Sequence, residues 1–307
     1  MSRVIRVGSR KSMLAMSQTN IVLEELRRVW PNVEFKVVPI ITEGDEDLRG
    51  GQHRRGKDAF VRAIEEKLLA RDIDFAVHSM KDLPARLPKG LTIAAVPRRE
   101  DPRDALISRE GKKFSELPEK AGVGTSSIRR RIQLLSMRPD LEVVELRGNV
   151  NTRIRKLRER NLDAIVVAFA GLKRIGLADK VTEVFPIEAM LPAPGQGALA
   201  VEAREEDDKI LEILKTVDRV DSRACVEAER AFMERVGGGC DVPMAAYAYI
   251  IDEGKLLLEG MATSPDSIKI IRASGTGEIS EAVEIGCRLA EDVMVRLAQV
   301  SVESDEN

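Results

Sequence analysis

The chain has 307 residues, of which 43% are hydrophobic, 33% charged and 3% aromatic, and its formal net charge is −2. This length supports a large buried core and two or three domains, and the composition excludes an intrinsically disordered chain. Its longest apolar run is far shorter than the roughly 20 residues that a membrane span needs, and three scattered cysteines exclude a disulfide framework.

Targeting, metal and assembly signals are few. The chain begins "MSRVIRVGSRKS" without an apolar signal region, so we expect a cytoplasmic protein without a membrane partner. The two histidines, His53 and His78, lie far apart and no HExxH or CxxC pair occurs, which argues against a metal site. Nothing in the surface pattern demands more than a monomer.

Short β-branched runs alternate with helical patterns up to about residue 217. Apolar stretches such as "IDFAV" (73–77) and "LDAIVVAF" (162–169) are typical of strands covered on both faces. The pattern therefore predicts an α/β fold with mixed, mostly parallel sheets flanked by helices. The segments "VPRREDPRD" (96–104) and "LPAPGQG" (191–197) are interpreted as crossings between two lobes.

The pattern changes after residue 218. A helical stretch, "DSRACVEAERAFMERV", leads into a glycine-rich segment, and three strand-like runs and a helix from about 280 to 297 follow. Strands in series favour an antiparallel sheet. The end of the chain is predicted to be a small α+β domain with a three-stranded antiparallel sheet.

Polar turns follow two strands of the first lobe. "GSRKS" (8–12) places Arg10 and Ser12 at a strand-to-helix turn, and "AVHSMKDLP" (76–84) places Lys81 and Asp82 after another. Asp82 could accept hydrogen bonds from N–H donors of a cationic intermediate. The alternative is that Asp82 only pairs with Lys81 or a nearby arginine.

Two similar turns occur in the second lobe, within a segment (98–160) where 17 basic and 10 acidic residues leave a net charge of +7. "GVGTSSIRR" (122–130) suggests an anion at a helix N-terminus, with an ordinary Ser/Thr cap and solvated arginines as the alternative. "LRGNVNTRIRKLRER" (146–160) places Arg147 at a strand end and Arg153 one turn into a helix, beside a basic helix face that could be merely solvated.

The stretch "RVGGGCDVP" places Cys240 directly behind three glycines. Taken alone, it is compatible with an inert buried thiol after a helix that ends at Gly237. A thiol on so pliable a segment could also be a nucleophile.

Seven motifs together resemble one family. "AVHSMKDLP", "REDPRDA", "VGTSSIRR", "LRGNVNTR", "AGLKRIGL", "LPAPGQGA" and "GGGCDVP" occur in the order and spacing of porphobilinogen deaminase, also called hydroxymethylbilane synthase. The resemblance spans Val4 to about Leu297. It implies a transferase of tetrapyrrole biosynthesis that joins four porphobilinogen molecules head to tail into hydroxymethylbilane, releases ammonia, and is primed by a covalently bound dipyrromethane cofactor.

The resemblance also implies the domains. Two lobes like those of periplasmic solute-binding proteins would comprise residues 1–97 with 198–217 and residues 98–197. Residues 218–307 would form a third domain that carries the cofactor cysteine.

The family's site residues map onto this sequence. Cys240 would form a thioether with the dipyrromethane, and Asp82 would be the catalytic carboxylate. The residues that would hold cofactor carboxylates are Lys81, Ser127, Arg129, Arg130 and Arg153. Those on the side of the incoming porphobilinogen would be Arg10, Ser12, Arg147, Arg174 and Gln196.

The sequence departs from the family pattern in two places. It has "GKDAF" (56–60) where the family commonly has "GKG" before phenylalanine, and the charged segment 45–58 is interpreted as a mobile lid. The helix after Ser12 carries "LAMSQ", so any aromatic contact from that position is absent.

Two rival interpretations leave features unexplained. A two-lobed module that only captures an anion gives Cys240 no role and usually has an export signal. A nucleic-acid binder would use the basic segment, but Phe114 is its sole aromatic residue, so base stacking is poorly supplied. We therefore expect a small-molecule partner, porphobilinogen, and no nucleic acid.

Overall fold

The structure is a computed structural model that describes residues 4–41, 61–237, 243–264 and 269–305. The chain divides into two compact units, residues 1–100 with 198–226 and residues 101–197 with 227–307. The boundaries of the three predicted domains, after residues 97, 197 and 217, stay predictions.

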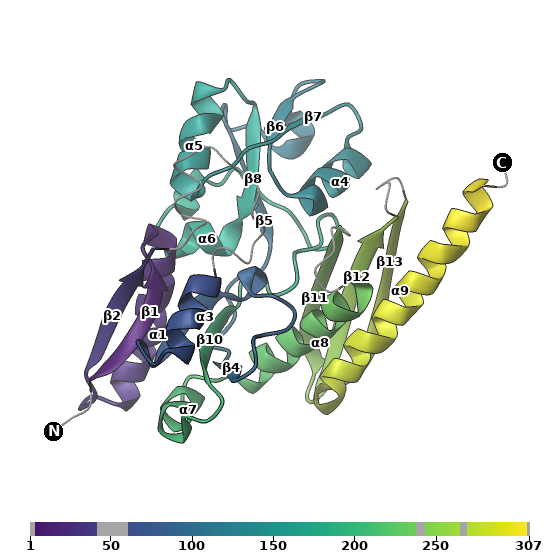
Figure 1. Cartoon of the computed structure of the whole chain (residues 1–307). Coiled ribbons are helices and arrows are strands. Elements are labelled where there is room, and N and C mark those ends of the chain that lie inside the picture. The colour runs from purple at the N-terminus through teal and green to yellow at the C-terminus, as the bar shows by residue number, and fades with distance from the viewer. Residues whose placement is uncertain (1–3, 42–60, 238–242, 265–268, 306–307) are drawn as a thin grey trace. The chain divides into compact units, whose positions relative to one another are not determined.

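A five-stranded sheet forms the centre of the first unit, in the order β2-β1-β3-β10-β4 (Figure 1). Four strands run in one direction and β10 runs in the other, so the sheet is mixed and mostly parallel, as predicted. Its elements are β1 (Ile5–Arg10), α1 (Met13–Val29), β2 (Phe35–Ile40), α3 (Arg62–Leu69), β3 (Phe75–Ser79), the 3-10 turn η2 (Met80–Asp82), β4 (Leu91–Ala95), β10 (Leu199–Arg204) and α7 (Asp208–Lys215).

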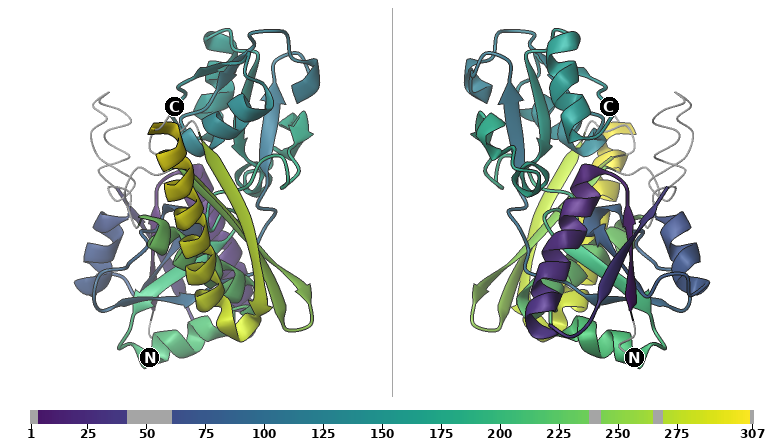
Figure 2. Two further views of the ribbon diagram at one scale, coloured as in Figure 1. Left: turned by 90° about the vertical axis from the view of Figure 1, so that its right-hand side faces the viewer. Right: turned by 90° about the vertical axis from the view of Figure 1, so that its left-hand side faces the viewer.

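Both faces of this sheet are buried, which explains its continuous apolar strands. Phe75 and Val77 of β3 belong to a core with residues of α1 and α7, and the intervening Ala76 packs with Ile64 and Leu68 of α3. Figure 2 shows α1 lying along its face of the sheet. The carboxyl ends of β1 and β3 are left between the N-terminal ends of two covering helices.

The second unit contains a sheet of the same design, in the order β7-β6-β8-β5-β9, with β5 reversed against the other four strands. Alternate residues of β8 pack on opposite sides, Val166 with Leu134 of α4 and Val167 with Leu157 of α5. Its elements are β5 (Asp104–Ser108), η3 (Phe114–Glu116), β6 (Gly122–Gly124), α4 (Ile128–Met137), β7 (Glu142–Val144), α5 (Val150–Glu159), β8 (Ala164–Ala168), α6 (Phe169–Arg174), η4 (Ala178–Lys180) and β9 (Glu183–Val184).

The end of the chain confirms the predicted α+β pattern. Three antiparallel strands, β11 (Met244–Asp252), β12 (Lys255–Thr263) and β13 (Ile270–Glu278), form a separate sheet. The helix α9 (Ala282–Asp305), which follows the turn η5 (Ile279–Glu281), lies along this sheet (Figure 2). α9 also packs closely on α8 (Val220–Gly237), since a Cβ at Gly286 would lie 2.3 Å from the Ala228 carbonyl oxygen.

No helix within the described ranges is long and apolar enough to cross a membrane.

Candidate functional site

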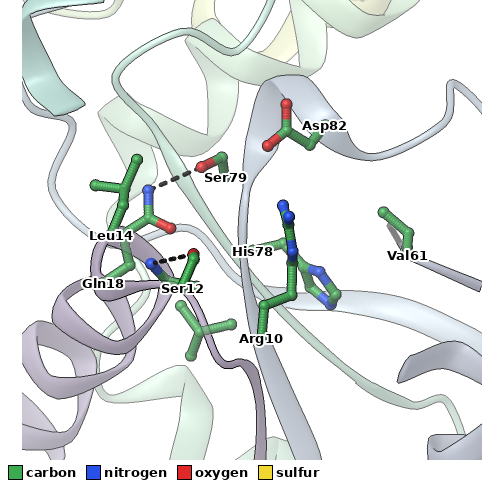
Figure 3. A pocket seen from close by; sticks show the side chains of 10 residues that line it. Arg10, Ser12, Leu14, Gln18, Val61, His78, Ser79 and Asp82 are labelled. Atoms are coloured by element: carbon green, nitrogen blue, oxygen red, sulfur yellow. Dashed lines mark hydrogen bonds between the residues drawn. The ribbon is translucent and has the colours of Figure 1, made fainter. Parts of the chain in front are cut away.

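A pocket lies where β1 and β3 end in the first unit. The two strands are parallel neighbours, so their carboxyl ends meet at one edge of the sheet, where α/β proteins commonly bind ligands. The pocket encloses about 410 Å³, including space open to solvent. Its lining residues are Arg10, Ser12, Leu14, Ala15, Gln18, Val61, Val77, His78, Ser79 and Asp82 (Figure 3).

The first helix brings two polar side chains to this pocket. Ser12 is the N-cap of α1, and its hydroxyl accepts a hydrogen bond from the Ala15 N–H at 3.2 Å. One turn further on, the buried Gln18 amide donates to the Ser79 hydroxyl at 2.8 Å (Figure 3). The N-terminal turn of α1 is thereby joined to the end of β3.

Asp82 is positioned by the turn that follows β3. Met80 is buried, and its N–H donates to the Ala198 carbonyl at 3.1 Å, which fixes the start of the turn η2. Asp82 is half-buried and lines the pocket.

A buried cationic cluster occupies the second unit. Arg129 and Arg130, in the first turn of α4, are each 6% exposed. Their guanidinium groups lie 2.8 Å and 2.7 Å from the two oxygens of Asp104, which is fully buried at the start of β5. Gln196 is buried too, and its amide donates to Asp104 at 2.9 Å. The structure thus joins three predicted site residues around one carboxylate.

The electrostatics of Asp104 follow from this arrangement. Burial raises the pKa of Asp104, but Arg129 and Arg130 more than offset it and hold that pKa well below its usual range. Burial in turn lowers the pKa of Arg129. One carboxylate faces two guanidinium groups, so the buried group carries a net positive charge.

Arg153 adds a third cation near this group. Its guanidinium donates to the Gly148 carbonyl at 2.7 Å and to the Ser126 hydroxyl at 3.4 Å. Burial, with the charges of Arg130 and Arg147, lowers the pKa of Arg153 to about 10. Crowded cations of this kind favour an anionic ligand.

Side chains cap the N-termini of α4 and α5 in this unit. Ser127 caps α4 by accepting from the Arg130 N–H at 3.4 Å, and Asn149 caps α5 by accepting from the Thr152 N–H at 2.9 Å. Gly148 has a φ of +126°, and a Cβ there would lie 2.7 Å from a Thr152 side-chain atom. The sharp turn after β7 therefore requires glycine.

Two further predicted residues lie outside the buried group. Arg147 does not end a strand as predicted, because β7 already ends at Val144; it is exposed and pairs with Glu145 at 2.7 Å. Arg174 is half-buried at the end of α6 and donates to the Gly197 carbonyl, next to Gln196, at 2.6 Å.

Two sequence predictions lie outside the described residues. Cys240 belongs to the undescribed range 238–242, and the predicted lid belongs to the range 42–60. The described part of α8 reaches Gly237, three residues before the cysteine. Among the residues that are described, no group of three His, Cys, Asp or Glu side chains could hold a metal ion.

Sequence reasoning did not single out Asp104 or Gln18. Asp104 is the last acidic residue of "REDPRDA" and leads directly into "ALIS", a position where a carboxylate starts a buried strand. Gln18 shares a helix face with the buried Ala15 and Val22, so an amide at that spacing signals a buried polar contact.

Asp104→Asn is expected to destabilise the second unit by about 3–5 kcal/mol, because it leaves two buried guanidinium groups without their counter-ion. A carboxyl whose folded-state pKa is depressed contributes stability at neutral pH that is lost as the pH falls through its ordinary value of about 4 toward the folded-state pKa. Urea unfolding at pH 7 and pH 3 measures both effects. Equal stability of the two proteins at pH 7 would contradict this assignment.

The chain matches one family over nearly all of its length. Residues 5–212 match "Porphobilinogen deaminase, dipyromethane cofactor binding domain", and residues 223–294 match "Porphobilinogen deaminase, C-terminal domain". A porphobilinogen deaminase of Brevibacillus brevis is 43% identical over 307 residues, covering 98% of this chain and 99% of the relative. One of Thermus thermophilus is 48% identical over 292 residues, covering 95% and 96%.

Among solved structures, the methionine-binding protein MetQ is similar at 16% identity and a TM-score of 0.44, over 70% of this chain and 88% of that one. A likeness at this level says nothing about ligand or activity.

Proposed function

The chain belongs to the porphobilinogen deaminase family of tetrapyrrole-forming transferases, and from this premise we propose that it joins four porphobilinogen molecules into hydroxymethylbilane with release of ammonia. The observation that carries the proposal is that one unit holds a net positive, buried arginine cluster and the other a pocket in which Asp82 is the one carboxylate among the described lining residues. Every pyrrole of the substrate and the product carries two carboxylates, an acetate and a propionate, so such cations suit both.

The residues of the cluster fit the family's dipyrromethane cofactor, which carries carboxylates. Arg129 and Arg130 share one carboxylate, Asp104, and the charge of Arg130 also acts on Arg153, so the cluster can accept further negative charge. A guanidinium group has five N–H donors. Arg130 uses three of its donors, two on Asp104 and one on the Val166 carbonyl. When bound, the cofactor supplies the pyrrole end to which the first substrate is joined.

The cofactor-holding set comprises Arg129, Arg130 and Arg153 with Ser127 and Lys81. In this proposal Asp104 keeps the two buried guanidinium groups in place, and the cofactor carboxylates take the remaining donors. The Ser127 hydroxyl caps α4 at the same helix end, where unpaired N–H groups also favour an anion.

Cys240 tethers the cofactor in this proposal. A thiolate is the side chain best suited to trap a soft carbon electrophile, such as the aminomethyl pyrrole after loss of ammonia. The other two cysteines lie within helices, Cys225 buried in α8 and Cys287 half-buried in α9. Cys240 follows Gly237, Gly238 and Gly239, whose torsional freedom lets the thiol approach a bound group.

Asp82 acts on the substrate. Its carboxylate lines the same pocket as the Arg10 guanidinium and the Ser12 hydroxyl, which can hold substrate carboxylates while Asp82 accepts a pyrrole N–H. This placement stabilises the positive charge that develops on the pyrrole as ammonia departs. Arg147, Arg174 and Gln196 complete the substrate side of the proposal.

The proposed reaction is tested by incubating the purified protein with porphobilinogen and measuring both substrate consumption and ammonia. One ammonia per porphobilinogen consumed, with accumulation of a linear tetrapyrrole, is the expected result. Saturable binding of porphobilinogen without ammonia release would instead identify an anion-capturing module. Salt-steep nucleic-acid binding without turnover would identify the other rival.

A further inference from the structure

A buried histidine–glutamate pair lies in the first unit, beside the pocket. The Nε2 atom of His78 is 3.0 Å from an Oε2 atom of Glu202, and the two side chains are 3% and 0% exposed. His78, on β3, also lines the pocket with Arg10 and Asp82 (Figure 3). Neither residue has a role in the function proposed above.

The pair joins neighbouring strands close to the end of their ladder. His78 lies directly opposite Ala200 of β10, so Glu202 is its diagonal neighbour on the same face of the sheet. The next residue, Ser79, is the last of β3 in register with β10. The turn that carries Asp82 begins immediately afterwards.

Few other groups around Glu202 can compensate the burial of its carboxylate. Within the described ranges, neither the carboxylate oxygens of Glu202 nor the His78 Nε2 atom meet hydrogen-bond geometry with any group. The 3.0 Å ion-pair contact with His78 is therefore the polar contact that Glu202 makes there. The same face presents Arg10 from β1 and Arg204 from β10, and α3 covers it with Glu65. Arg204 is bonded to two carbonyls and to Asp207, and Asp82 and Lys81 lie on the turn beyond Ser79.

A lone buried carboxylate costs several kcal/mol, so Glu202 is expected to depend on its close contact with the His78 imidazole. Replacing a buried charged pair by apolar residues often leaves the protein equally stable or makes it more stable. The presence of this pair beside a pocket is therefore poorly explained by stability. Proteins depart from the preference for apolar residues in the core most often at functional sites.

We propose that His78 and Glu202 are a positioning pair for the reaction. Their 3.0 Å contact ties the end of β3 to β10, and so holds the Ser79 hydroxyl and the Asp82 carboxylate in place within the pocket. The inference rests on the proposed function, because it assigns the pair to the placement of the carboxylate that acts on the substrate.

A double substitution separates positioning from stability. His78→Leu with Glu202→Met replaces the pair by apolar side chains of similar volume. The thermal midpoint is expected to stay the same or rise, while kcat falls between about tenfold and a hundredfold with KM changed less, since small misplacements of reacting groups have effects of this size. Wild-type kcat in the folded double variant would overturn the proposal.

Glu202→Gln is the milder variant, for use if the double variant does not fold. It keeps the shape but removes the carboxylate, and the same selective loss of kcat is expected. The matched control is Asp74→Asn, an equally buried carboxylate just before the amino end of β3, which accepts hydrogen bonds from Arg6. The control should lose stability but keep its kcat; equal kcat losses in both variants would overturn the positioning role.

Nuclear magnetic resonance of the imidazole groups detects the pair independently of turnover. The chain has two histidines, so ¹⁵N-labelled imidazole signals in wild type and His53→Asn assign His78 uniquely. A slowly exchanging imidazole proton that disappears in Glu202→Gln is expected, and an unchanged His78 spectrum would overturn the pair. If wild type failed to consume porphobilinogen while this signature was present, the proposed function would fail but the pair would stand.

Discussion

Cys240→Ala is expected to give a folded protein with no measurable turnover of porphobilinogen. The account places the dipyrromethane on this thiol, and alanine offers no nucleophile to form the thioether. Because the cysteine follows a glycine-rich stretch outside any helix or strand expected from the sequence, its loss should not disturb the core. Turnover, the thermal midpoint and the content of covalently bound pyrrole are the three measurements.

Cys287→Ala is the matched control, because it removes a half-buried thiol from α9. It should keep full turnover and its bound pyrrole. A fully active Cys240→Ala protein, or one that still carries covalent pyrrole, would show that the tether is elsewhere or absent.

Asp82→Asn is expected to lower kcat by about 10²–10⁴-fold, the effect typical of a positioned acid–base group, while the fold is kept. The amide keeps the shape of the side chain but loses the negative charge that accepts pyrrole N–H bonds and stabilises the cationic pyrrole. Its half-buried position, with Met80 anchoring the turn instead, explains why folding should not depend on it. Steady-state kinetics and thermal unfolding measure the two effects.

Asp72→Asn is the matched control for Asp82→Asn. Asp72 is an exposed carboxylate of the same unit that pairs with Lys67. Its kcat should stay within about threefold of wild type, well below the effect of a positioned acid–base group. If Asp82→Asn also stayed within that range, a different carboxylate would have to act on the substrate.

The sequence pattern was sufficient to bring much of the first pocket together. Strand-to-helix alternation predicted parallel neighbours, and polar turns after β1 and β3 then had to meet at one sheet edge, as Arg10, Ser12 and Asp82 do in the pocket. The caps of α4 and α5 followed from local chemistry alone. The roles of these residues in catalysis stay proposals.

The pattern did not identify which strand of each sheet is reversed. β5 begins with Asp104, and β10 contains Glu202 and Arg204, so neither resembles a buried strand by composition. The two carboxylates face residues that are distant in sequence, Arg130 for Asp104 and His78 for Glu202. Pairing of this kind is set by the tertiary structure, and no local periodicity reports it.

The most direct test is the intact mass of the purified, catalytically active protein, followed by mapping of any added mass to one peptide. The account predicts a chain heavier than its sequence by two linked pyrrole units, with the addition located on the peptide that contains residue 240. Active protein whose thiol at that position is unmodified would contradict it.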